Sequence, residues 1–397
     1  MPRHRSSCIA PPRLARLPGF ATLLVAAAAA VAVTFGAVDP ASAIETEARE
    51  AILIDYDTRQ VLFEKNPDQP MPPSSMTKLM TVFLAFERLK DGRLKMTDEI
   101  PISETAWRMG GSKMFVPVGG RVSVSDILHG IIVQSGNDAT VALAEAISGS
   151  EEAFAALMTE RGREIGLQDS VFRNASGWPD PEHHMTARDL AILASETIRR
   201  FPEYYALYSE TTFTYNDIKQ GNRNPLLYKN MGADGLKTGH TEVAGYGLTA
   251  SAKRGDRRLI LVVNGLDSVR ARSDESERLL EWGFREFENL TLARKGEPVE
   301  SAEVWLGDQP EVPLVSDRDL FLTVNRTAKK GMTIAVEYSG PIPAPIVAGQ
   351  PLAMLRVSAP DMKDVTYPLY AGAAIGQLGP VGRVTSALGH LIWGAGG

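Results

Sequence analysis

Strand-like segments stand at both ends of a region that otherwise has a helical pattern, and this arrangement constrains the fold most. Two short apolar runs flank the polar segment 56–60, and this pattern predicts a β-hairpin. Strands at both ends with helices between them are typical of an α+β domain, in which helices flank an antiparallel sheet. The predicted strands are 51–55, 61–64, 235–239, 245–252 and 259–264.

Helices are predicted between and after these strands. Apolar residues from Leu79 to Phe86 recur at three- and four-residue spacing, which predicts a helix from Ser75 to the stop signal Asp91-Gly92. A polar break, 134–137, separates two further helices. The remaining predicted helices are 126–133, 139–147 and 276–287.

The sequence changes character beyond Arg294. Short β-like runs separated by Gly, Pro and Asp turns predict a small all-β domain over 295–374. In the last segment, 375–397, proline is tolerated at a first helical position, so we expect an amphipathic helix from Pro380 to Trp393. Such a helix can lie on a membrane surface or pack against the β domain, and both alternatives stay open.

The first 43 residues do not read as part of a fold. Four arginines precede an uncharged stretch, 17–38, and Ala41-Ser42-Ala43 supplies the small-x-small pattern of a signal-peptidase site. We therefore expect a secretory signal peptide over 1–43 and a catalytic domain over 44–294. An uncleaved anchor is the alternative, because the apolar stretch is long enough to span a bilayer.

Charge and cysteine usage limit the possible chemistry. The 397 residues include 42 Lys and Arg against 48 Asp and Glu, which argues against nucleic acid as a partner. The leader holds four Arg, one Asp and the single cysteine, Cys8, so residues 44–397 have 38 basic and 47 acidic side chains and a net charge of −9. A mature chain without cysteine has no thiol nucleophile and no Cys-ligated zinc.

A Ser-x-x-Lys element, Ser75-Met76-Thr77-Lys78, begins the first predicted helix. Residues three apart share a helix face, so Lys78 can lie beside the Ser75 hydroxyl and act as its base once desolvation displaces the lysine proton. The helix N-terminus adds partial positive charge where an oxyanion would form. In isolation the tetrapeptide also fits an N-cap serine followed by a solvated lysine.

Two further polar elements strengthen this interpretation. Ser135-Gly136-Asn137 offers a hydroxyl and an amide at the break between two helices. Lys237-Thr238-Gly239 offers a charge and a hydroxyl on a predicted strand, where Gly239 lets a ligand approach the backbone. Each alone is better explained as an interhelical loop or as the end of an edge strand, but their order together is specific.

The ordered triple resembles the serine acyl-transferase family of penicillin-binding proteins and β-lactamases. The flanking residues, such as Gly111-Ser112-Lys113-Met114 and Asp234–Thr241, are similar to the low-molecular-mass D-alanyl-D-alanine carboxypeptidases. The resemblance covers nearly the whole mature chain. It implies a β-lactamase/transpeptidase-like catalytic domain, a small β domain and a C-terminal amphipathic membrane anchor.

The resemblance also implies a role for each motif residue. Ser75 is expected to be the acylated nucleophile and Lys78 its general base. Ser135 and Asn137 are expected to pass a proton to the leaving D-alanine and to bind the substrate amide. Lys237 is expected to set the electrostatics of the cleft. No cofactor and no metal is expected.

The same resemblance assigns the remaining binding groups. The backbone N–H groups of Ser75 and His240 are expected to form the oxyanion hole. Arg272 matches the position that holds the terminal carboxylate of the substrate, with Thr238 sharing the task and Arg270 as a substitute. The expected partners are the peptidoglycan pentapeptide, β-lactam antibiotics as inhibitors, and the inner-membrane surface. The expected location is the periplasm, on the outer face of the cytoplasmic membrane.

Several alternatives remain open at this point. A β-lactamase of the best known class needs a loop glutamate before the Lys-Thr-Gly strand, and the segment 172–184 offers only Glu182. An endopeptidase acting on D-alanyl cross-links would use the same residues. A non-catalytic cell-wall-binding protein and a zinc peptidase using His183 and His184 are also considered, although no His-Glu-x-x-His motif is present.

Overall fold

The computed structural model describes residues 44–360, 362–382 and 384. The predicted leader, 1–43, and the predicted helix beyond residue 384 lie outside the described residues. No helix within the described ranges is long and apolar enough to cross a membrane.

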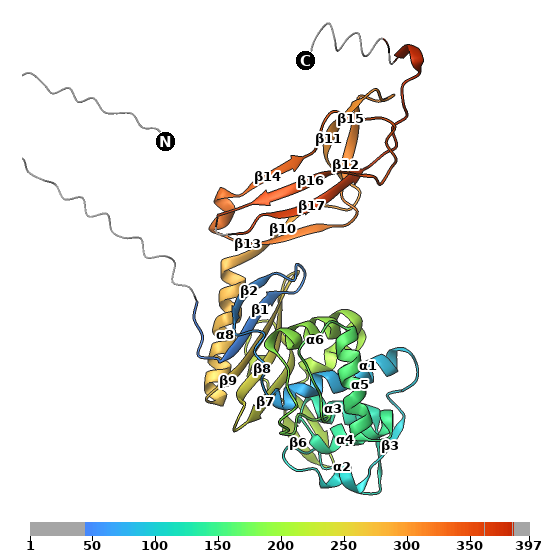
Figure 1. The fold of residues 1–397 in the computed structure, drawn as a ribbon. Coiled ribbons are helices and arrows are strands. Elements are labelled where there is room, and N and C mark those ends of the chain that lie inside the picture. Colours follow the sequence, from blue (N-terminus) through green and yellow to red (C-terminus); the bar gives the residue numbers. More distant parts are fainter. Residues whose placement is uncertain (1–43, 361, 383, 385–397) are drawn as a thin grey trace, which may run out of the picture. The chain divides into compact units, whose positions relative to one another are not determined.

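A five-stranded antiparallel sheet with the strand order β2–β1–β9–β8–β7 lies at the centre of the catalytic domain (Figure 1). This arrangement confirms the predicted α+β fold, because the N-terminal hairpin pairs with strands from the end of the domain. Strand β7 lies at one edge of the sheet. The strands are β1 (Glu50–Asp55), β2 (Val61–Lys65), β7 (Ala233–Thr241), β8 (Gly245–Arg254) and β9 (Arg257–Leu266).

Both faces of this sheet are covered. Alternate residues of each strand point to opposite faces, so each strand contributes side chains to two apolar cores. On β1, Ile52 and Ile54 belong to the apolar core that the helical layer shares. Ala51 and Leu53 belong to a second core, beneath α8 (Val269–Glu286). Helix α8 begins seven residues before its predicted start at Ser276, so Arg272 lies on the helix.

The helical layer covers the other face of the sheet (Figure 1). Helix α1 lies inside this layer, with ten of its thirteen residues buried. The helices are α1 (Lys78–Lys90), α2 (Glu104–Arg108), α3 (Val124–Ile132), α4 (Asn137–Ser148), α5 (Glu151–Glu164), α6 (Ala187–Arg200) and α7 (Pro202–Tyr205). Shorter elements are η1 (Ser74–Thr77), η2 (Ala206–Ser209), η3 (Pro225–Tyr228), and the hairpins β3 (Glu99–Pro101) with β4 (Arg121–Ser123) and β5 (Thr212–Tyr215) with β6 (Ile218–Gly221).

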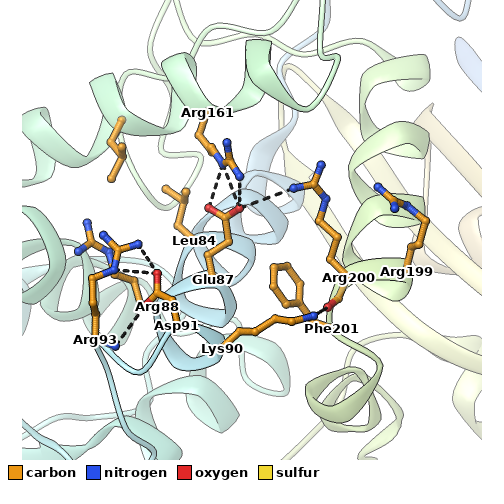
Figure 2. Close-up of a pocket in the computed structure, with 11 residues that line it drawn as sticks. Leu84, Glu87, Arg88, Lys90, Asp91, Arg93, Arg161, Arg199, Arg200 and Phe201 are labelled. Atoms are coloured by element: carbon orange, nitrogen blue, oxygen red, sulfur yellow. Dashed lines mark hydrogen bonds and ion pairs between the residues drawn. The ribbon is translucent and has the colours of Figure 1, made fainter.

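Three helices end at one cluster of ion pairs (Figure 2). Glu87 of α1 accepts hydrogen bonds from Nε of Arg161 at 2.9 and 3.0 Å, and Arg200 of α6 lies 4.0 Å from the same carboxylate. Lys90 donates to the backbone oxygen of Arg200 at 2.5 Å. Basic side chains in the last turn of a helix complement its dipole, so the cluster ties the C-terminal ends of α1, α5 and α6 together.

A second, all-β region follows α8. Strand β10 (Phe287–Ala293) pairs with β13 (Leu320–Asn325), so strand pairing groups residues 287–293 with this region and not with the catalytic domain that we expected to end at Arg294. The other strands form a six-stranded sheet. They are β11 (Pro298–Trp305), β12 (Glu311–Val315), β14 (Thr333–Glu337), β15 (Ile342–Pro343), β16 (Pro351–Ser358) and β17 (Val365–Ala371), and the short helix η4 (Ala328–Gly331) precedes β14.

Candidate active site

The first polar motif lies at the junction of two helical segments. Ser75 sits in the 3₁₀ turn η1, which runs directly into α1 at Lys78. The sequence predicted one continuous α-helix from Ser75, but its first turn has the tighter 3₁₀ form that is common at helix ends. Ser74, immediately before the predicted nucleophile, has a left-handed backbone with φ of 50°.

The side chain of Lys78 is completely buried and makes three hydrogen bonds. Its Nζ donates to Ser75 Oγ at 2.9 Å, to Asn137 Oδ1 at 2.7 Å and to the backbone oxygen of Ser176 at 2.7 Å. The first of these places an amine within proton-transfer distance of the serine hydroxyl. The other two fix the position of the lysine.

The environment of Lys78 favours its neutral form. Burial is the main cause, and the nearby charge of Arg223 adds to it, so that the pKa of Lys78 falls to about 7. A lysine with its usual pKa near 10.5 is protonated at neutral pH and cannot accept a proton. The folded chain therefore gives Lys78 the property that a general base needs.

The second motif lies in the connection between α3 and α4. Ser135 has φ of 61°, and its Oγ has no hydrogen-bond partner among the described residues although it is buried. Asn137 donates from Nδ2 to the backbone oxygen of Gly110 at 2.8 Å. An amide carries two N–H donors, so this bond leaves a second one for a substrate carbonyl.

Asp138 holds this connection in place, and the sequence analysis did not assign it a role. Its fully buried carboxylate accepts hydrogen bonds from the backbone N–H groups of Met114 and Phe115 at 2.9 Å and of Val116 at 3.2 Å. These contacts fasten the Ser135–Asn137 turn to the segment 112–116. The acidic residue directly after the motif is the only signal in the sequence, and its partners are set by the tertiary structure.

The third motif lies on the edge strand β7, as the sequence analysis allowed. Lys237 is 3% exposed and Thr238 is 5% exposed. The reason for glycine at position 239 is different from the one expected. A Cβ at Gly239 would lie 2.8 Å from the backbone oxygen of Pro73 and 3.2 Å from Ser74 Cβ, so packing of β7 against η1 excludes a side chain there.

Four basic side chains gather around the motifs, and nothing in the sequence indicated one of them, Arg223. Burial and the charges of Lys78, Arg223 and Arg272 lower the pKa of Lys237 well below its usual range. Arg223 follows β6 at a position with no recognisable motif. Only the fold brings it near the lysines, where uncompensated positive charge attracts an anionic ligand.

Arg272 fits the role of carboxylate ligand better than Arg270 does. The Arg272 side chain is 5% exposed, its Nε is a buried donor with no partner among the described residues, and burial lowers its pKa to about 10. Arg270 is 92% exposed and pairs with Asp274 at 3.4 Å. A buried donor without a partner is costly unless a ligand satisfies it.

His240 follows the third motif on β7 and stacks on Tyr246 with a centroid separation of 3.9 Å. That the backbone N–H groups of Ser75 and His240 form the oxyanion hole remains a prediction. Since β7 is an edge strand, the N–H groups that do not face β8 have no partner strand.

The alternatives that used residues 182–184 are not supported by the structure. Glu182 is 71% exposed and pairs with Arg173 at 3.0 Å, so it is tied outside the cleft. Burial lowers the pKa of His183 to about 4, and its Nε2 lies 3.0 Å from Thr77 Oγ1. Among the described residues, no group of His, Cys, Asp and Glu has the arrangement of a metal site.

Comparison with known proteins gives a direct result. The sequence profile of the D-alanyl-D-alanine carboxypeptidase family matches residues 37–268, more than half of the chain. The chain belongs to this family. A second profile, that of the penicillin-binding protein 5 C-terminal domain, matches residues 287–377.

Two relatives in this carboxypeptidase family match the chain over most of their own length. The D-alanyl-D-alanine carboxypeptidase DacC of Escherichia coli (strain K12) is 38% identical over 358 residues, covering 88% of this chain and 90% of the relative. The structure of penicillin-binding protein 5 from Haemophilus influenzae matches with a TM-score of 0.77 and 38% identity, covering 85% of this chain and 100% of that one.

A smaller relative is known with an antibiotic bound. Penicillin-binding protein D2 from Listeria monocytogenes, in its ampicillin-bound form, matches with a TM-score of 0.56 and 29% identity, covering 61% of this chain and 99% of that one. These matches confirm the family that the three motifs predicted, with its α+β catalytic domain and the β domain that follows.

Proposed function

We propose that the chain is a serine-type D-Ala-D-Ala carboxypeptidase that removes the terminal D-alanine from peptidoglycan pentapeptides, and that penicillin acylates it at Ser75. The observation that carries this proposal is the 2.9 Å hydrogen bond from the buried Lys78 Nζ to Ser75 Oγ. The names of the relatives support the same reaction.

The first half of the reaction forms an acyl-enzyme. Neutral Lys78 takes the proton of Ser75, and Oγ attacks the carbonyl carbon of the penultimate D-alanine. The backbone N–H groups of Ser75 and His240 stabilise the oxyanion, and each such donor is typically worth about 3–4 kcal/mol. Ser135 gives its proton to the leaving nitrogen and takes up the proton that Lys78 received, the C–N bond breaks and D-alanine departs. Lys78 is then neutral again.

The second half returns the enzyme to its starting state. Water attacks the ester carbonyl carbon and gives its proton to neutral Lys78, and the C–O bond to Ser75 breaks. Ser75 regains a proton, and the shortened peptide leaves with a new carboxylate. The basic side chains of Lys237, Arg223 and Arg272 favour binding of the substrate carboxylate before the reaction.

The test uses the purified mature chain, residues 44–397. We expect one penicilloyl mass on the peptide containing Ser75 and release of D-alanine from a D-Ala-D-Ala peptide. Ser75→Ala is expected to abolish both, while Ser209→Ala, a change at an exposed serine, leaves both intact. Labelling and turnover in Ser75→Ala equal to the unsubstituted enzyme would show that the nucleophile is elsewhere.

The choice between carboxypeptidase and endopeptidase is tested with two substrates. One substrate is a monomeric pentapeptide, and the other is a cross-linked peptide dimer. We expect faster release from the pentapeptide, because the buried cations match a free terminal carboxylate, which a cross-linked D-alanyl bond lacks. Faster cleavage of the dimer would identify an endopeptidase.

We also propose that the protein is exported and attached to the outer face of the cytoplasmic membrane. The basic and apolar leader with its Ala-Ser-Ala exit supports export. Attachment is tested by fractionation of the mature chain and of a form ending at Gly379, which keeps the bridge of Ile346 with Ile375 and so preserves the β domain. Equal membrane partitioning of the two forms would refute the helical anchor.

A further inference from the structure

A pocket of about 650 Å³ lies where α1, α5 and α6 end, and the proposed reaction does not use it (Figure 2). Six of its eleven lining residues are basic and two are acidic, although residues 44–397 carry a net charge of −9. The basic residues are Arg88, Lys90, Arg93, Arg161, Arg199 and Arg200. The pocket therefore concentrates positive charge on an acidic protein.

The pocket is separate from the catalytic cleft. Helix α1 begins at Lys78, which contacts Ser75, and it ends at Lys90, which lines the pocket. An α-helix rises 1.5 Å per residue, so the two ends of α1 are about 18 Å apart. A ligand in the pocket therefore leaves the cleft free for substrate.

Four of the basic side chains are matched by four carboxylates. Each forms at least one ion pair with a carboxylate of the pocket wall or of a neighbouring helical turn. These pairs are Arg93 with Asp91, Arg161 with Glu87 and Glu164, and Arg199 and Arg200 with Glu196. Two positive charges, those of Arg88 and Lys90, have no such match.

Arg88 and Lys90 also keep hydrogen-bond donors that no protein group uses. Arg88 is half-buried, yet its guanidinium forms no hydrogen bond and no ion pair with any residue in the described ranges. Lys90 Nζ donates to the backbone oxygen of Arg200 at 2.5 Å and lies 5.7 Å from the ring centre of Phe201. A guanidinium has five N–H donors and an ammonium group has three, so most of these donors are available to a ligand.

The helix dipoles explain why basic residues gather here, but they do not explain the unused donors. Carbonyl groups at the C-terminal end of a helix carry partial negative charge, which attracts cations. Within the described part of the chain, Lys90 is the one basic residue of the pocket that donates to such a carbonyl. The guanidinium of Arg88 is thus placed in a pocket without a protein acceptor, where an anion from solution can bind it.

The charge and size of the pocket favour a phosphate monoester. A phosphate monoester carries a charge of about −1.5 to −2 at pH 7 and three acceptor oxygens, which matches two unpaired cations. A single carboxylate would match only one of them. Arginine binds phosphate with two parallel N–H bonds. The pocket volume falls within the range of about 300–1,000 Å³ that is typical of small-molecule sites, so a phosphate with its organic group fits.

We propose that this pocket binds a phosphate monoester, and that Arg88 and Lys90 hold the phosphate group. The phosphate belongs either to a soluble sugar phosphate or to the head group of a phospholipid, since both present the same dianion. The other basic side chains keep the potential of the pocket positive. The site does not depend on the proposed carboxypeptidase function.

The first test titrates glucose 1-phosphate into the mature chain, residues 44–397, at low salt and near pH 7.5, and measures binding by calorimetry. We expect a dissociation constant on the order of 1 mM. Arg88→Gln is expected to weaken binding about tenfold, because it removes charge-assisted hydrogen bonds. Lys90→Gln, at an exposed position, is expected to weaken it about threefold. Arg285→Gln, which changes a basic residue in the last turn of α8 outside the pocket, should leave it unchanged.

A change of opposite sign separates binding from a merely structural role. Asp91→Asn removes a negative charge from the pocket and frees Arg93, so we expect it to tighten binding about threefold. Damage to the fold would weaken binding instead. Equal melting temperatures show that the variants are folded.

A second test distinguishes the two sources of the phosphate. The mature chain and the double variant Arg88→Gln/Lys90→Gln are sedimented with phosphatidylcholine vesicles that contain phosphatidic acid, whose head group is a phosphate monoester. Vesicle binding that the double variant loses supports a lipid head group. Binding of glucose 1-phosphate without such a loss on vesicles supports a soluble ester.

Two outcomes overturn the proposal. The basic side chains of the catalytic cleft also attract anions, so the decisive comparison is between the mature chain and the double variant. If both bind glucose 1-phosphate and the vesicles equally well, the anion binds elsewhere and the pocket is not its site. If neither ligand binds the mature chain at about ten times the expected dissociation constant, the pocket does not bind phosphate monoesters.

Discussion

Lys78 Nζ donates a 2.9 Å hydrogen bond to Ser75 Oγ from a side chain that has no exposure to solvent. The pair combines the proposed nucleophile, which is partly exposed, with a proposed base that water does not reach. Burial lowers the pKa of Lys78 to about 7, so that the neutral form is accessible near neutral pH. Its two other hydrogen bonds, to Asn137 and Ser176, hold it beside the serine.

Lys78→Arg is expected to block acylation. Arginine retains a positive charge and a similar length, but its guanidinium group stays protonated in proteins, so it cannot take the serine proton. Mass spectrometry after incubation with penicillin measures the labelled fraction. Lys219→Arg, at an exposed position, is the matched control, and normal labelling kinetics in Lys78→Arg would refute the base role.

The acylation rate is expected to rise with pH through a midpoint near 7. Only neutral Lys78 accepts the proton, so below its pKa of about 7 the rate falls tenfold per pH unit. Arg223→Gln removes a positive charge that disfavours protonation of Lys78, so the midpoint moves to higher pH. Stopped-flow acylation between pH 5 and 9 measures both, and a flat profile contradicts the assignment.

Asp138→Asn is expected to destabilise the catalytic domain by about 1–3 kcal/mol. The carboxylate accepts from the backbone of three residues in the segment 114–116, and an amide replaces one acceptor oxygen with a donor. Urea unfolding followed by circular dichroism measures the loss. Acylation should fall as well, since Asn137 is adjacent, whereas Asp217→Asn on an exposed turn should change neither.

Glu87→Gln is expected to cost about 1–2 kcal/mol of stability without changing acylation. Glu87 is the partner that Arg161 and Arg200 share where three helices end, and its side chain is only 19% exposed. Glu164→Gln removes a second partner of Arg161 that is 52% exposed and should cost less than about 0.5 kcal/mol. Equal losses in the two variants would show that the cluster is not structural.

Stability is expected to fall as the pH drops from about 6.5 to 4. His183 has a folded pKa of about 4, below the unfolded value of 6.5, so the unfolded chain binds a proton that the folded chain resists. The contribution is complete above pH 6.5 and amounts to about 3 kcal/mol. Unfolding free energies of His183→Gln and His184→Gln between pH 4 and 7 test this, and only the first should flatten the dependence.

The sequence predicted those site residues that contact one another because they are close together in the chain. Ser75 and Lys78 lie one helical turn apart, so their contact follows from local geometry alone. Arg223 and Asp138 could not be assigned in this way. Arg223 has no motif, and the backbone partners of Asp138 lie more than twenty residues away in the chain, where only tertiary packing decides what they contact.

The fold class was predictable for a similar reason, while two boundaries were not. Alternation and turn residues indicated the strands of the central sheet. Helix α8 begins earlier than predicted because Ser268 accepts a hydrogen bond from Ala271 N and caps the helix. The prediction missed this start because charged residues in the first turns interrupt the periodic pattern of apolar residues. Strand β10 follows α8 without a loop, so no turn residue marked the boundary.

The contact between Gly239 and the backbone oxygen of Pro73 bears on antibiotic resistance. An enzyme could in principle exclude β-lactams by adding a side chain beside its nucleophile. At position 239 that route is closed, because any Cβ pushes β7 away from the turn that presents Ser75 and so damages the native reaction as well. Selection for an enzyme that escapes the drug and still trims peptidoglycan must therefore act on other positions.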